Sequence, residues 1–185
     1  LEVYVPLQAR DTAFDFRELE NACIEVTVAG ESFVVESRFS CPEPAWKTGS
    51  CDYFRHSRKV TRLPEGLEVT DTFTNLTGGN LALMHRHEVQ VEGLQGLWLA
   101  GLPQPGLAGK SASSHNPTTF GTTSRAGVGL LPREDVFRIH VANYAMNNSL
   151  GLADNNLVLP PGREYSARWL IVPTETPDYW RFINA

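Results

Sequence analysis

The sequence predicts an all-β domain built as an antiparallel β-sandwich. Hydrophobic residues make up 42% of the 185 residues and charged residues 20%, the balance of a globular domain with its own core. The 15 Gly and 12 Pro are spread between short apolar runs, as turns between strands would be. Within those runs apolar and polar residues alternate with a period of two, which indicates half-buried strands. We expect one domain over residues 1–185.

The first strands are expected near the N-terminus. Apolar and polar residues alternate over 22–28, and Gly30 and Glu31 then supply a turn before the alternating run 33–39. This pattern predicts a β-hairpin. Further along, Leu67 to Thr74 has one apolar and one polar face, and Gly78 and Gly79 follow it in a turn. We expect this strand to pair with the next run, Leu81 to Val91, as a second antiparallel hairpin.

Later strands are predicted at 120–123, 137–143, 156–159 and 164–172, and Trp169 is expected in the core. Between Gly93 and Gly127 the composition shifts to Gly, Pro, Ser and Thr, which predicts a long loop, with a hidden low-propensity strand as the alternative. Pro177 and Asp178 are helix-start signals. We expect a short helix there, with residues 177–185 beginning a linker or a following domain.

The run Leu81 to Val91 is the most informative for function. In a strand, His85 and His87 share an otherwise apolar face, while Arg86 and Glu88 lie on the opposite face. Three interpretations of the two imidazoles stay open: structural groups with satisfied hydrogen bonds, a polar patch that faces a glycan, or metal ligands. No third ligand is identifiable by spacing. The position of Glu88 argues against its serving as the carboxylate partner of either histidine.

Asp71 interrupts the apolar face of its own strand, where an unpaired carboxylate is costly. It therefore needs a partner, such as an arginine or backbone amides, and we favour a structural role over a catalytic one. The sequence has neither a G-x-S-x-G nucleophile elbow nor a phosphate-binding G-x-x-x-x-G-K-[ST] loop. Serine hydrolase and nucleotide-binding functions therefore lose their main support.

Aromatic residues in polar segments suggest a binding surface. Trp46 lies in the polar loop 42–50, Tyr53 follows it, and Trp98 borders the Gly- and Pro-rich region. Exposed rings stack on sugars, whereas buried rings would only close an end of the core. The candidate glycan-binding residues are Trp46, Tyr53, Asp71, His85, Arg86, His87 and Trp98.

The three cysteines are too few for a disulfide-built fold, and they lack the spacing of a zinc-binding pair. Cys41 and Cys51 flank one loop and form a disulfide if their Cα atoms come within about 7 Å; free thiols are the alternative. We expect no cofactor and no metal site, with a structural calcium ion left open. The net charge of −5 argues against nucleic acid, and no apolar run approaches the length of a membrane span.

The segment Leu67 to Thr77, followed by a strand with His85 and His87, resembles β-supersandwich domains of the galactose-mutarotase-like type, which accompany glycoside hydrolases and polysaccharide lyases. The segments 116–121, 129–138 and 157–162 are similar to stretches of such bacterial accessory domains. Residues 178–184 resemble the junction that leads into a following catalytic domain.

This resemblance implies a supersandwich-like fold in a piece of a longer, multidomain, carbohydrate-active protein. The expected function is non-catalytic: the module binds a polysaccharide or oligosaccharide, or packs against a neighbouring glycoside hydrolase domain. An extracellular or periplasmic location is expected. Two alternatives remain: an aldose-epimerase-like enzyme in which His85 or His87 protonates the ring oxygen, and a purely structural interaction domain. The glutamate base of the epimerases has no matching position in this sequence.

Overall fold

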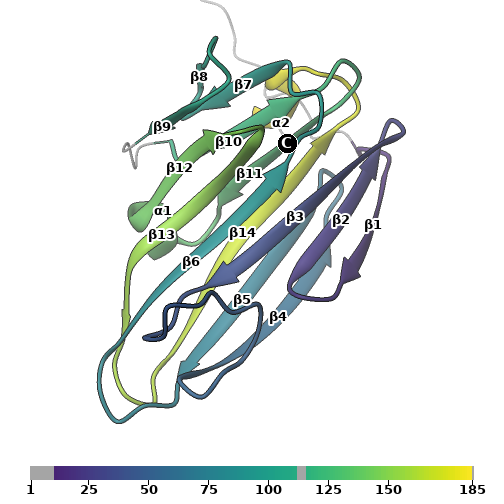
Figure 1. The fold of residues 1–185 in the computed structure, drawn as a ribbon. Coiled ribbons are helices and arrows are strands. Elements are labelled where there is room, and N and C mark those ends of the chain that lie inside the picture. Colours follow the sequence, from purple (N-terminus) through teal and green to yellow (C-terminus); the bar gives the residue numbers. More distant parts are fainter. Residues whose placement is uncertain (1–10, 112–115, 185) are drawn as a thin grey trace, which may run out of the picture.

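The computed structural model describes residues 11–111 and 116–184, which form two seven-stranded antiparallel sheets packed face to face (Figure 1). Sheet A contains, in spatial order, β1 (Phe14–Leu19), β2 (Cys23–Val28), β3 (Glu31–Phe39), β6 (Leu81–Gln90), β13 (Ser149–Leu159), β12 (Val141–Met146) and β9 (Gly109–Ser111). Sheet B contains β4 (Phe54–Arg62), β5 (Leu67–Asn75), β14 (Glu164–Thr174), β11 (Gly127–Pro132), β10 (Thr119–Thr122), β7 (Gly96–Leu99) and β8 (Leu102–Pro103). The predicted antiparallel β-sandwich is confirmed.

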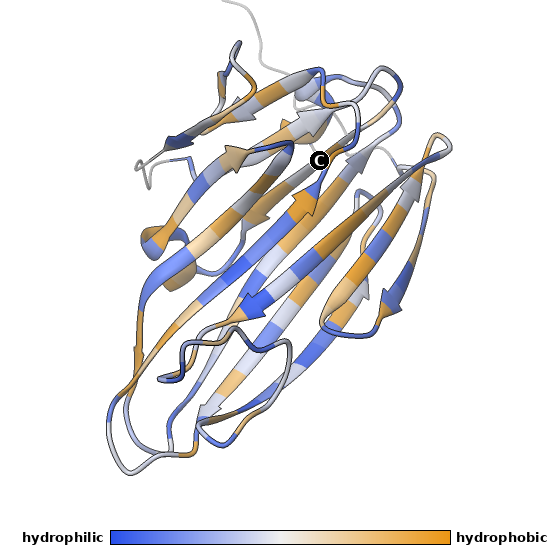
Figure 2. Cartoon of the chain, viewed as in Figure 1, coloured by the Kyte–Doolittle hydropathy of each residue, from blue (hydrophilic) through white to orange (hydrophobic). Residues whose placement is uncertain are grey.

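The core lies between the sheets and follows from the period-two alternation, which Figure 2 shows as bands of opposite hydropathy along the strands. On β5, Leu67, Val69 and Phe73 are fully buried, and the threonines between them are only half-buried. Trp169 of β14 is fully buried, as predicted. The predicted first hairpin is also confirmed, since β2 and β3 pair with Ile24 opposite Val35.

The predicted pairing of Leu67–Thr74 with Leu81–Val91 is wrong. The strands that contain them, β5 and β6, lie in opposite sheets: β5 pairs with β4 and β14, whereas β6 pairs with β3 and β13. The turn between them crosses the sandwich, where the Asn75 side chain donates to the carbonyl oxygens of Gly79 and Leu159, both at 2.8 Å. Each strand has one apolar face. Packing the apolar face of β5 against that of β6 across the sandwich buries both faces, as pairing the two strands in one sheet would also do.

The long loop predicted between Gly93 and Gly127 is wrong in part, and its alternative is correct. The region contains the short strands β7, β8, β9 and β10, whose pairing extends both sheets. Their composition hides them, since Gly and Pro have low strand propensity. Packing requires glycine at one of these positions, Gly121, because a Cβ there would collide with the Leu150 side chain across the core. Residues 112–115 lie outside the described part.

The strand predicted at 137–143 is correct only from Val141 onward, where β12 begins. The preceding residues form helix α1 (Asp135–His140), because the Glu134 carboxylate accepts hydrogen bonds from the backbone N–H groups of Val136 and Phe137, both at 2.9 Å. Such an N-cap overrides the local alternation. The strands predicted at 156–159 and 164–172 are confirmed within the longer β13 and β14.

The predicted C-terminal helix is confirmed as α2 (Tyr179–Ile183), with Asp178 as its N-cap. Its Phe182 is buried against sheet B over Gly129, where any Cβ would collide with the ring. That α2 also begins a linker or a further domain stays a prediction. No helix in the described ranges is long and apolar enough to span a membrane.

Candidate functional site

The structure divides the candidate glycan-binding residues among three places. Asp71, His85 and His87 are fully buried between the sheets. Trp46 and Arg86 meet on the outer face of sheet A, the side that points away from sheet B. Tyr53 and Trp98 lie apart from both groups and are half-buried. We describe the interior group first.

Asp71 has the partner that its position demands. Its carboxylate accepts hydrogen bonds from Arg58 Nε and Nη2 at 2.7 and 3.0 Å, from Trp169 Nε1 at 2.9 Å, and lies 2.7 Å from His56 Nε2. Burial alone would raise the pKa of Asp71, but the Arg58 charge and the His56 hydrogen bond more than offset it and hold that pKa well below its usual range. Asp71 is therefore a buried anion clamped by its neighbours, and the expected arginine partner is confirmed.

The two imidazoles of β6 are enclosed and hydrogen-bonded. His87 Nδ1 lies 2.9 Å from Ser37 Oγ, and His87 Nε2 lies 3.1 Å from His85 Nδ1. The His87 ring also stacks on Trp169, with centroids 4.1 Å apart. Burial lowers the pKa of His87 well below its ordinary value, although the Asp71 charge partly opposes this. His87 is therefore neutral in the folded protein.

The network continues toward the surface through Asp154 of β13. The Asp154 Oδ2 atom lies 3.4 Å from both His85 Nε2 and His140 Nδ1, without the geometry of a full hydrogen bond to either. His140, the last residue of α1, is partly exposed. These contacts form a chain that runs from Ser37 through His87 and His85 to Asp154. Ser37, His87 and His85 are thus hydrogen-bonded in series, whereas His85 Nε2 and Asp154 Oδ2 approach each other without a full hydrogen bond.

No group of three or more His, Cys, Asp or Glu side chains within 11–110 and 116–184 is arranged to hold a metal ion. The three cysteines are free thiols, so Cys41 and Cys51 are not joined. The Cys41 sulfur instead lies 3.5 Å from the carbonyl oxygen of Ala45. The expectation of no cofactor, with calcium left open, stays a prediction.

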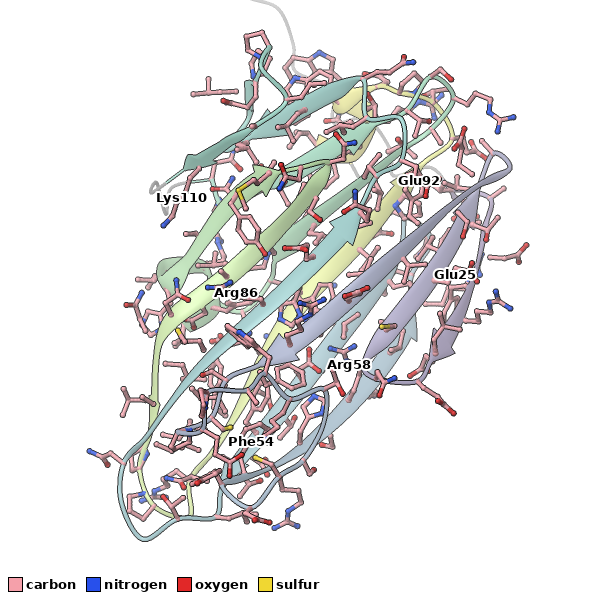
Figure 3. All side chains as sticks on the ribbon, viewed as in Figure 1. Glu25, Phe54, Arg58, Arg86, Glu92 and Lys110 are labelled. Carbon is pink, nitrogen blue, oxygen red and sulfur yellow. The ribbon has the colours of Figure 1, made fainter. Side chains whose placement is uncertain are left out.

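The outer face of sheet A carries the other candidates. Trp46 belongs to the loop 40–53, which follows β3 in Figure 1, and its side chain is 38% exposed. The Arg86 guanidinium carbon lies 4.7 Å from the centre of the Trp46 ring, a cation–π contact. Arg86 and the half-buried Arg58, both labelled in Figure 3, belong to different sheets. Together Trp46 and Arg86 offer an exposed ring beside a cluster of hydrogen-bond donors.

Polar groups surround this pair on the same face. On β6, Glu88 accepts a hydrogen bond of 2.7 Å from the Tyr144 hydroxyl of β12, which reaches it across Gly151 of the intervening β13. Burial and the hydrogen bond to Glu88 both raise the pKa of Tyr144 above its ordinary value. On β3, Arg38 donates to Glu36 at 2.8 Å. The face thus combines an aromatic ring with fixed donors and acceptors.

Tyr53 and Trp98 pack against clusters of apolar side chains. Trp98 stacks on Tyr179 of α2, with ring centroids 5.5 Å apart, and contacts Phe120. Tyr53 packs at the end of the sandwich against the buried cluster that contains Phe39 and Phe54. Both rings close parts of the apolar interior, which is the alternative that the sequence left open for them.

Sequence reasoning missed Arg58, Asp154 and Tyr144. Arg58 lies on β4, a strand that was not predicted because its inward residues include His56 and Arg58. The period-two spacing of Phe54, His56, Arg58 and Val60 is the signal that could have found it.

No model of a known protein family matches the sequence, and no curated protein matches it.

Proposed function

We propose that this chain is a non-catalytic module of a carbohydrate-active protein and that it binds a glycan on the outer face of sheet A. One observation carries the proposal: the Trp46 ring is partly exposed on the outer sheet face, and the Arg86 guanidinium carbon lies over it, 4.7 Å from the ring centre. A pyranose ring has one apolar face, which stacks on an aromatic ring, and hydroxyl groups at its rim, which need donors and acceptors. Arg86, Glu88 and Tyr144 supply such groups.

In this proposal Asp71, His85 and His87 act from the interior. Their contacts lie between the sheets and leave the outer side of β6 free for a ligand. The aldose-epimerase alternative receives less support, because His85 and His87 are fully buried and a sugar would reach them only if the sheets separated. A polysaccharide ligand fits the expected extracellular or periplasmic location, with neither nucleic acid nor membrane as a partner.

Docking on a neighbouring catalytic domain is the second candidate. The observation that favours it is Trp180 of α2, which is 68% exposed although Phe182 of the same helix is buried against sheet B. A large exposed indole on a helix that is anchored to the domain is the kind of residue that protein interfaces bury. This use of α2 is compatible with glycan binding on sheet A.

Affinity electrophoresis against a broad panel of polysaccharides, together with a glycan array, tests the main proposal. We expect at least one glycan to bind, and Trp46→Ala to weaken its affinity about tenfold, the effect of losing ~1.4 kcal/mol of stacking energy. Trp180→Ala is the control, because it removes an even more exposed indole from another part of the surface. Retention of glycans by the wild type but equal weakening in both variants would contradict the assigned face.

A further inference from the structure

We propose that the glycan recognised by this face is acidic, and that Arg86 binds the carboxylate of a uronic acid residue. This inference rests on the proposed function, because it names the ligand class of the same surface. The argument depends on how the charged side chains of sheet A are partnered.

Like charges lie directly opposite each other on this face. The register of β3 and β6 places Arg38 opposite Arg86 and Glu36 opposite Glu88. Such pairs destabilise a sheet unless each charge finds another partner, whereas opposite charges in the same positions would stabilise it. The arrangement therefore has a cost in stability that the fold alone does not explain.

Three of the four charges are partnered within the protein. Arg38 donates to Glu36 at 2.8 Å, and Tyr144 donates to Glu88 at 2.7 Å. Glu88 lies two residues from Arg86 on the same face of the strand, yet it is held by Tyr144. Among the side chains that the structure describes, no carboxylate pairs with Arg86. Arg86 is thus the basic group of this patch that is left to bind an external anion.

Trp46 prepares Arg86 for that role. A guanidinium held over an indole loses side-chain freedom before the ligand arrives, while the N–H donors in its own plane stay available. Those donors form a planar fork that matches a carboxylate in a bidentate pair. The residues that follow Arg86 in the same cross-strand row, Ala153 and Ala142, have short, uncharged side chains that cannot pair with the guanidinium.

Matched polysaccharide pairs test the inference. Polygalacturonate, alginate, glucuronoxylan and hyaluronan are each compared with the carboxyl-reduced form, in which the carboxylate has become a neutral hydroxymethyl group; sulfated and neutral glycans complete the panel. We expect the wild type to bind one acidic form at least about tenfold more tightly than its reduced partner, which corresponds to ~1.4 kcal/mol for one charge-assisted pair. We expect Arg86→Gln to abolish this preference, and Arg86→Lys, which keeps the charge without the fork, to retain only part of it.

Arg55→Gln is the matched control, because Arg55 is an exposed arginine of β4 in the opposite sheet. Equal loss of the acidic preference in Arg55→Gln would overturn the inference by showing a general charge effect. Equal binding of acidic and reduced forms, or preference for sulfated glycans, would overturn the carboxylate assignment and leave glycan binding intact. Failure to bind any glycan in the whole panel would overturn the proposed function itself. Unfolding midpoints of the variants verify that each is folded.

Discussion

The two faces of β6 show what separates a structural polar residue from a binding one. His85 and His87 point inward and meet Ser37, Asp154 and each other. Arg86 points outward, next to them in sequence, and pairs with no carboxylate in the described part of the chain. All three residues are polar in the sequence, whereas their partners differ completely. A binding residue is thus recognised by hydrogen-bond donors or acceptors that have no partner within the protein. Only the three-dimensional arrangement reveals which groups these are.

The largest effect is expected from removing the anchor of the interior network. Asp71→Ala leaves the Arg58 guanidinium buried without its anion and removes the partner of the Trp169 N–H. Breaking such a buried pair from one side costs about 3–5 kcal/mol, and we expect that loss in the free energy of unfolding measured with urea. Asp52→Ala is the control, because Asp52 is exposed. A loss below about 1 kcal/mol for Asp71→Ala would contradict the structural role of the network.

Acid is expected to lower the free energy of unfolding through His87 of the interior network. The folded-state pKa of His87 is depressed by burial, so below its ordinary value of 6.5 the unfolded chain binds a proton that the folded protein does not. Stability is therefore retained above pH 6.5 and lost as pH falls below it, by up to ~1.4 kcal/mol per pH unit. The depressed pKa of Asp71 adds a further loss only below about its ordinary 3.8.

Urea unfolding between pH 7.5 and 4.5 measures this dependence, in a range above the ordinary pKa of Asp71. His87→Gln removes the titrating group, and we expect its stability to change less steeply over the same range. A wild-type stability that stays constant from pH 6.5 to 4.5 would show that His87 can be protonated without unfolding.

Gly151→Ala connects the two faces. A Cβ at this position would come within 2.5 Å of the His87 carbonyl oxygen and 3.0 Å of the Tyr144 hydroxyl. The tyrosine would have to leave Glu88, and the ladder between β13 and β6 would have to shift. Overpacking of this kind costs about 1–3 kcal/mol, measurable by thermal or urea unfolding. Gly78→Ala is the control, because a Cβ there meets nothing within 4 Å; equal stability of the two variants would refute the packing argument.

Tyr144→Phe is expected to change stability least and is the sharpest test of the outer face. It removes one hydrogen bond, worth about 0.5–1.5 kcal/mol, and releases Glu88, which can then pair with Arg86. We expect weaker binding of the acidic glycan, with the unfolding free energy lowered by no more than that amount. Tyr165→Phe, which removes a 2.6 Å hydrogen bond to Glu134 elsewhere in the structure, is the control. Unchanged glycan affinity in Tyr144→Phe would show that Glu88 does not compete for Arg86.

Local patterns predicted the strands well where alternation was strong. The hairpin of β2 and β3 could be read from its alternating residues and its turn, because adjacent segments joined by a short turn pair readily. The same logic failed for β5 and β6, since an apolar face is buried equally well by a strand of the same sheet or of the facing sheet. It also failed at 137–140, where the Glu134 cap lies outside the alternating segment.

The sequence by itself determined the all-β class, the inward placement of His85 and His87, and the need of Asp71 for a partner, because these follow from period two and from the cost of burying charge. Only the tertiary structure decided which partners they have, since Arg58 of β4 and Asp154 of β13 reach the interior from separate strands. It also decided that Arg86 meets Trp46, whose loop lies about forty residues before it in the chain. Long-range packing, which no local pattern encodes, selects the groups that remain for a ligand.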